Sequence, residues 1–161
     1  PMAVRDVIAL GRFAHGGPLG RLGPADAAAV AQAITACGLE ALADRPGDSL
    51  SGGERARMHV ARALAAVAAA LLADEPTAAI AVLEILKART AAGSAVLVIL
   101  HDLSLAARMC DRIVLMDKGR VVADGAPQDV LTAARIAAIY GVDARWRDGA
   151  LSIEGLTPSR G

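Results

Sequence analysis

One segment of this chain carries residue types that suit contact with a phosphate. Leu50-Ser51-Gly52-Gly53-Glu54 precedes a run with apolar or small residues at helical spacing. The start of a helix has free backbone N–H groups and the positive end of the helix dipole, and glycine lets an anion come close. A Ser-Gly-Gly turn is also common as ordinary punctuation between two elements. Ser51, Gly52 and Gly53 are therefore candidate phosphate contacts.

A second segment is an apolar run that ends in two adjacent carboxylates. Residues 68–73 read Ala-Ala-Ala-Leu-Leu-Ala, and Asp74, Glu75 and Pro76 follow. A continuous apolar run is typical of a buried parallel strand, and open α/β sheets bind ligands beyond the carboxyl ends of their strands. One carboxylate could then hold a metal ion through water, and the other could orient an attacking water. The alternative is a strand followed by a solvated acidic turn.

A third segment places a histidine after another predicted strand. Residues Ser94 to Leu100 are β-branched and apolar, and the run stops at His101-Asp102. This pattern puts an imidazole at the end of a second buried strand. A single histidine in such a place is also commonly a capping or core residue.

The elements that must position these residues follow an α/β pattern. We expect the main helices and strands of the first two thirds at Pro24–Cys37, Glu54–Ala66, Ala69–Ala73, Ile80–Ala91 and Ala95–Leu100. Ile113–Met116 and Arg120–Ala123 are predicted strands around a turn, which is hairpin spacing. The tail from Asp143 is weakly patterned, and we expect its last residues, Thr157 to Gly161, to be disordered.

In this order, the three segments resemble the ATP-binding subunit of an ABC transporter. Leu50–Glu54 resembles the signature loop of that family, Leu71–Glu75 resembles its Walker B strand with the catalytic glutamate, and His101 resembles its switch histidine. The resemblance covers nearly the whole chain. It implies an α/β fold, the P-loop NTPase (RecA-like) core of an ABC ATPase in part, with an α-helical subdomain. Residues 1–66 would form the helical subdomain with the signature loop and its helix, and residues 67–161 the partial catalytic core and tail.

The resemblance also implies a role for each candidate residue. Two subunits of a homodimer would enclose ATP, and Ser51–Gly53 of one would contact the γ-phosphate bound to the other. Asp74 would hold Mg²⁺ through water. Glu75 would polarise the attacking water, and His101 would contact the γ-phosphate and sense its loss. Such a site works by positioning and by stabilising the charge on the phosphoryl group.

Within the family, three stretches resemble importers of haem, ferric siderophores or cobalamin. They are Val7–Arg12, His101–Arg108 and Ile139–Val142, and the similarity to haem-importer ATPases is greatest. We therefore expect an ATP-hydrolysing subunit of an ABC importer for haem or another iron chelate. It would lie on the cytoplasmic face of the bacterial inner membrane, bound to transmembrane permease subunits and acting indirectly with a substrate-binding protein.

The chain departs from the family pattern at two points. It has no Gly-x-x-x-x-Gly-Lys-Ser/Thr motif, because neither Lys87 nor Lys118 follows a glycine loop. We therefore expect an internal or C-terminal fragment of a longer subunit. After Thr77 the family continues Ala-Ala-Leu-Asp-Pro, whereas here Ala79 runs straight into Ile80, through an evolutionary loss or an incomplete record. The competing hypothesis is a truncated or degenerate remnant that binds partners without hydrolysing ATP.

Composition argues against two other classes of protein. Lys and Arg together number 17, as do Asp and Glu, so no patch for a polyanion is implied. Aromatic residues make up 2% of the chain, which disfavours base stacking and hence nucleic acid as a partner. Cys37 and Cys110 lack metal-type spacing, and we expect buried thiols.

Overall fold

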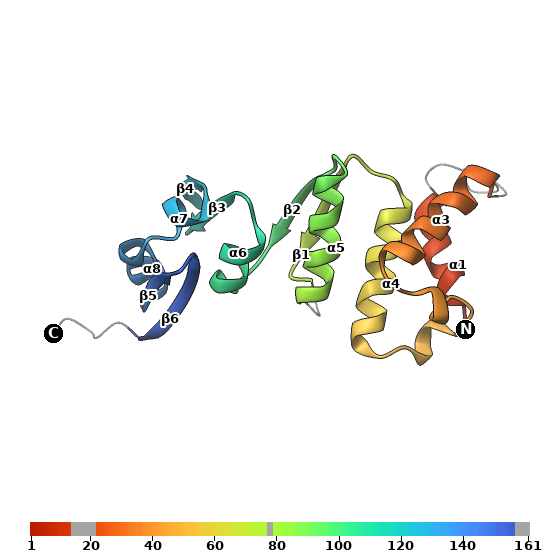
Figure 1. Ribbon diagram of the computed structural model, residues 1–161, viewed down its shortest axis with the longest axis horizontal. Helices are drawn as coiled ribbons and strands as arrows, with labels where there is room; N and C mark the ends of the chain where they lie inside the picture. Colours follow the sequence, from red (N-terminus) through yellow and green to blue (C-terminus); the bar gives the residue numbers. More distant parts are fainter. Residues whose placement is uncertain (14–21, 77–78, 157–161) are drawn as a thin grey trace. The chain divides into compact units, whose positions relative to one another are not determined.

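The computed structural model describes residues 1–13, 22–76 and 79–156, and its contacts divide the chain into two compact units, Pro1–Ile99 and Leu100–Gly161 (Figure 1). The first unit contains α1 (Val4–Ala9), η1 (Leu10–Arg12), α3 (Pro24–Ala36), η2 (Glu40–Leu42), η3 (Gly47–Ser49), α4 (Gly52–Ala65), β1 (Ala70–Asp74), α5 (Ala79–Ala91) and β2 (Ala95–Ile99). The second contains α6 (Leu103–Met109), β3 (Ile113–Asp117), β4 (Arg120–Gly125), α7 (Pro127–Val130), α8 (Ala133–Tyr140), β5 (Val142–Arg147) and β6 (Ala150–Leu156).

Helices α1, α3 and α4 pack around one apolar core, which we call the helical core. It includes the fully buried Val4, Ile8 and Leu39, together with Ala61 and Leu64 of α4. Helix α3 begins with Pro24 at its first turn, where the fixed φ of proline suits a helix, and Gly38 at φ 60° follows its end. These sequence signals explain why α3 has the length observed.

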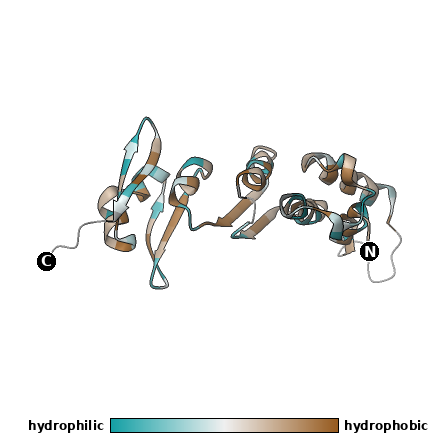
Figure 2. Cartoon of the chain, turned by 90° about the horizontal axis from the view of Figure 1, so that it is seen from below, coloured by the Kyte–Doolittle hydropathy of each residue, from teal (hydrophilic) through white to brown (hydrophobic). Residues whose placement is uncertain are grey.

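Strands β1 and β2 form a parallel pair that positions the carboxylates. Leu72 pairs with Leu97, and Asp74 pairs with Ile99 at the carboxyl end. Helix α5 packs against the pair and supplies buried apolar side chains, and Leu71 on β1 packs against the helical core. The other face is open, since Leu72 is 73% exposed and Leu97 is 61% exposed. The hydrophobic character of these strands can be followed in Figure 2.

The second unit is built from two antiparallel hairpins, β3–β4 and β5–β6, around a separate core. Leu131 and Ile136 are fully buried there, and Trp146 donates its indole N–H to the Leu131 carbonyl at 2.8 Å. The weakly patterned tail forms the hairpin β5–β6 as far as Leu156, and the predicted disorder of residues 157–161 lies outside the described residues. In β5, the buried Ala144 alternates with exposed arginines, as expected for a strand with one covered face. Asp148 and Gly149 both have positive φ, which makes the tight turn that a two-residue hairpin needs.

The other predicted elements are present with small shifts. The strands expected at Ala69–Ala73 and Ala95–Leu100 differ from β1 and β2 by one residue, and α4 begins two residues before the predicted Glu54. The contacts divide the chain after Ile99, so the predicted lobes 1–66 and 67–161 stay a prediction. Across the residues that the structure describes, no helix is long and apolar enough to cross a membrane.

Candidate nucleotide-contacting site

Ser51 is the N-cap of α4, and it forms a reciprocal capping box with Glu54. The Ser51 oxygen accepts the Glu54 N–H at 3.4 Å, while the Ser51 N–H donates to the Glu54 carboxylate at 2.8 Å. The Ser51 hydroxyl also donates to that carboxylate, at 2.7 Å. These hydrogen bonds from Ser51 hold the pKa of Glu54 below its usual value. The start of the signature loop helix is therefore fixed by local chemistry.

Gly52 and Gly53 leave the backbone of this first turn accessible. Both residues are exposed, and a Cβ added to either would meet no heavy atom of the described residues within 4 Å. Their N–H groups belong to the first turn of the helix, where no intrahelical acceptor exists. An anion can thus approach the backbone closely while the helix dipole attracts it. The loop fits a phosphate.

Asp74 and Glu75 lie at the carboxyl end of β1. The Glu75 N–H donates to the Ile99 carbonyl at 3.2 Å, which extends the strand pairing by one residue, and both carboxylate residues are exposed. Glu75 has φ of 41°, a left-handed conformation that is unfavourable for a residue with a side chain. Backbone strain of this kind is concentrated at functional sites. It turns the chain sharply immediately after the strand.

The fit of this site to a magnesium ion depends on the Asp74 carboxylate. Among the described residues, no group of three or more His, Cys, Asp or Glu side chains could hold a metal. Mg²⁺ commonly keeps several waters and binds through one or two carboxylates and substrate phosphates. Asp74 is compatible with such an ion.

His101 belongs to the second unit, two residues beyond the end of β2. It is exposed, and it directly precedes Asp102, the N-cap of α6. The Asp102 carboxylate accepts the Leu105 N–H at 2.9 Å, so its role is to begin that helix. The contact of His101 with the γ-phosphate stays a prediction.

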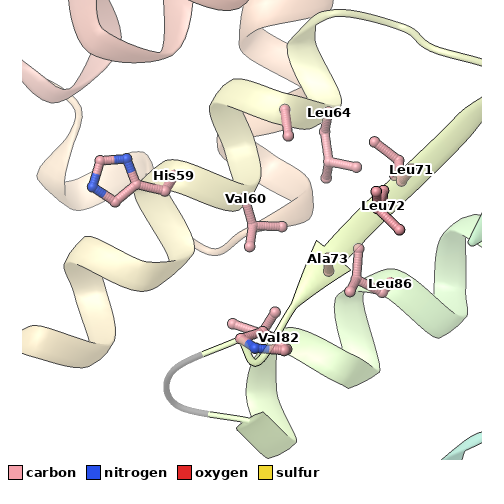
Figure 3. A pocket seen from close by; sticks show the side chains of 10 residues that line it. His59, Val60, Leu64, Leu71, Leu72, Ala73, Val82 and Leu86 are labelled. Carbon is pink, nitrogen blue, oxygen red and sulfur yellow. The ribbon is translucent and has the colours of Figure 1, made fainter. Parts of the chain in front are cut away.

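A pocket of about 150 Å³ lies between α4, β1 and α5 (Figure 3). Figure 3 shows Val60 and Leu64 of α4 on one side and Leu71 of β1 and Leu86 of α5 on the other. Its lining is apolar apart from His59. A triphosphate needs cationic groups or free N–H groups, so this pocket does not suit one.

Two residues of this region were not singled out as functional from the sequence. Glu54 could have been found, because Ser-x-x-Glu before a helix is the spacing of a capping box. Arg12, only 8% exposed, gave no such signal, since its burial depends on three elements that meet in space.

Residues 3–78 match the family described as ABC transporter. The hemin import ATP-binding protein HmuV of Rhodococcus jostii is 48% identical over 122 residues, an alignment covering 72% of this chain and 42% of that protein. The chain is homologous to ABC transporter ATP-binding subunits. The predicted family is thereby confirmed. The chain spans about half the length of the curated relatives it matches, from 42% to 62% of three of them.

Solved structures confirm the predicted ABC ATPase fold. One neighbour is a metal-chelate type ABC transporter in an inward-facing conformation, with a TM-score of 0.80 and 23% identity over 96% of this chain and 67% of that one. Another is a dimeric ATP-binding cassette in a post-hydrolysis state with ADP and Pi, with a TM-score of 0.62 and 25% identity over 79% of this chain and 57% of that one.

Proposed function

We propose that this chain is part of the ATP-hydrolysing subunit of an ABC importer for haem or a related iron chelate. The observation that carries the proposal is the start of α4, where Ser51 caps the helix and Gly52 and Gly53 leave the backbone open. The names of the relatives as hemin import proteins support the choice of haem.

Each candidate residue has a role in this proposal. Ser51–Gly53 bind the γ-phosphate of ATP held by the opposite subunit through N–H groups at the helix start. Glu75 orients and polarises the attacking water, and His101 contacts the γ-phosphate. Asp74 holds Mg²⁺ through water. When bound with ATP, the ion neutralises charge on the phosphate oxygens.

The partners in this proposal are a second ATPase subunit and a pair of transmembrane permease subunits, with a substrate-binding protein acting through the permease. The dimeric cassette among the solved neighbours supports the first partner. The subunit would sit peripherally on the cytoplasmic face of the bacterial inner membrane. Closure around ATP and reopening after hydrolysis would bias the permease between two states.

ATP hydrolysis in proteoliposomes tests the proposal. The subunit is expressed from its complete reading frame, assembled with its permease, and assayed for phosphate release and haem uptake. Glu75→Gln should lower hydrolysis by at least about a hundredfold, the range for loss of a general base. Glu84→Gln is the matched control, because Glu84 is exposed on α5 and should leave the rate unchanged.

The same assay separates the proposal from the remnant hypothesis. Assembly with the permease without any hydrolysis would contradict the ATPase proposal and support a binding module. The isolated 161 residues should hydrolyse no ATP, because their sequence offers no Gly-x-x-x-x-Gly-Lys-Ser/Thr cradle. Turnover by the isolated chain that disappears in Glu75→Gln would show that interpretation to be wrong.

A further inference from the structure

Arg12 is a charged side chain buried among the helices. Among the residues that the structure describes, Arg12 is the one charged residue that is buried, with 8% of its surface exposed. Its Nε donates to the Asp26 carboxylate at 2.8 Å, and its Nη1 donates to the Ala65 carbonyl at 2.9 Å. A buried guanidinium is tolerated when its N–H groups are paired in this way. Arg12 therefore joins η1 to the first turn of α3 and to the last residue of α4.

Gly11 provides an independent observation of the same junction. A Cβ added there would collide with the carbonyl oxygen of Arg62 and lie 3.3 Å from the Ala65 Cβ. The backbone of η1 thus lies directly against the last turn of α4. Glycine permits this approach because it has no side chain.

The junction also satisfies two helix ends. The Ala65 carbonyl belongs to the last turn of α4, where carbonyls have no intrahelical partner, and a cation there interacts favourably with the helix dipole. Asp26 accepts the Gly23 N–H at 2.9 Å, so the partner of Arg12 also closes the start of α3. Sliding α4 along its axis would break the hydrogen bond from Arg12 to the Ala65 carbonyl and leave a buried guanidinium N–H without its acceptor, while the pair with Asp26 would remain.

We propose that Arg12 is the positioning residue that fixes α4, and with it the signature loop at the other end of the helix, to η1 and α3. Helix α4 is continuous from Gly52 to Ala65, so displacement of its last turn is carried to its first. The consequence for catalysis rests on the proposed function. A loop that must meet a phosphate held by another subunit tolerates little error in placement.

Backbone amide exchange across α4 in the full chain tests the role of Arg12. Arg12→Gln should speed exchange about tenfold both near Ala65 and at Arg55 in the first turn, the size of effect expected for loss of a charged hydrogen bond. Arg12→Lys should give a smaller change at both ends, because it keeps the charge but lacks the fork that reaches two acceptors. Arg112→Gln is the control, since Arg112 forms an exposed bidentate pair with Asp124 in the second unit.

Gly11→Ala tests the same junction without changing a charge. It should push η1 off α4 and reproduce faster exchange at Arg55. Gly47→Ala is its matched control, because a Cβ there would meet the Met58 sulfur at 3.4 Å, an ordinary contact. If Arg12→Gln does not fold, Arg12→Lys and Gly11→Ala decide the question.

A change confined to the last turn of α4 would overturn the positioning role and leave Arg12 a local cap. So would unchanged exchange at Arg55 in both Arg12→Lys and Gly11→Ala. Because exchange needs no ATP, its failure is distinct from failure of the proposed function. A chain with the expected exchange pattern but no ATPase activity in the assembled importer would uphold Arg12 and contradict the ATPase.

Discussion

The helices around α4 and the strand pair β1–β2 carry the two halves of the candidate chemistry, and they are built differently. The helical core encloses Ile8 and Leu39 fully and closes over the buried Arg12. The strand pair has one face covered by α5 and one face on which Leu72 and Leu97 are exposed. Parallel strands are ordinarily covered on both faces. The signature loop thus stands on a closed core, and Asp74 and Glu75 stand on an open sheet.

This difference indicates which of the two regions holds its candidate residues in a fixed position. Catalytic groups act well when the elements beneath them are locked by packing and by hydrogen bonds. The capping box at Ser51 supplies hydrogen-bond partners at the start of α4, and Arg12 supplies one to the Ala65 carbonyl at its end. For Glu75, the backbone N–H donates to the Ile99 carbonyl, and the residue itself has a left-handed φ. We expect the phosphate-contacting half to be the more rigid one.

Ile8→Ala compared with Leu72→Ala gives the largest expected contrast. Ile8 is fully buried in the helical core, so its truncation should lower the free energy of unfolding by about 2–5 kcal/mol. Leu72 is 73% exposed, and its truncation should change that free energy by less than about 0.5 kcal/mol. Urea unfolding followed by circular dichroism measures both. Equal losses would mean that the outer face of the sheet is covered in solution.

Cys37 offers a test of the same core by pH. Burial raises the pKa of its thiol from 9.0 to about 11, because the thiolate is disfavoured away from water. The folded chain therefore holds this proton more tightly than the unfolded chain. The resulting stability is fully present below pH 9.0 and is lost as the pH rises towards about 11. The loss should total about 2–3 kcal/mol, since each unit of pKa shift is worth about 1.4 kcal/mol.

Cys37→Ala should remove that alkaline slope from the unfolding free energy, although it lowers stability at neutral pH. The matched variant is Cys110→Ala, because Cys110 is only half-buried. The slope should survive in it. A slope that persists unchanged in Cys37→Ala would show that other groups cause the alkaline loss.

The two regions also differ in how far sequence could predict them. The Ser-Gly-Gly loop, the apolar strand and the Asp-Glu pair have local signals, and the structure places α4 and β1 within two residues of their predicted bounds. The close approach at Gly11 and the bond from the buried Arg12 to Ala65 join residues 50 or more apart in the chain, which no local pattern encodes. Hairpin β5–β6 lacked a local signal because β5 reads Val-Asp-Ala-Arg-Trp-Arg, in which charged residues take three of the six positions.

Ser51→Ala should sharpen the view that α4 is held at both ends. Loss of an N-cap costs about 1 kcal/mol, and here the substitution removes both hydrogen bonds of the Ser51 hydroxyl and keeps the one from its backbone N–H. Thr132→Ala, which removes the N-cap of α8 in the second unit, is the comparison. Thermal unfolding of both variants measures the loss. If Ser51→Ala is silent while Thr132→Ala is not, the start of α4 is held by its core contacts rather than by its cap.

Glu54→Gln has the smallest expected effect and isolates the charge in that cap. The pKa of Glu54 is lowered by hydrogen bonds from the Ser51 hydroxyl and N–H, so its contribution to stability is present above pH 4.5 and is lost as the pH falls through the lowered value. Glutamine can accept the same bonds without a charge, so the variant should keep its fold, and its free energy of unfolding should fall less steeply in acid.

Asp124→Asn is the comparison, because the pKa of Asp124 is lowered by a hydrogen bond from the Arg112 cation. Added salt should weaken the Asp124 contribution more than the Glu54 contribution, since salt screens a pair of ions but little affects bonds from neutral donors. Equal salt sensitivity would mean that the Glu54 carboxylate is held mainly by nearby arginines, and that the first turn of α4 is less locally determined than its capping box indicates.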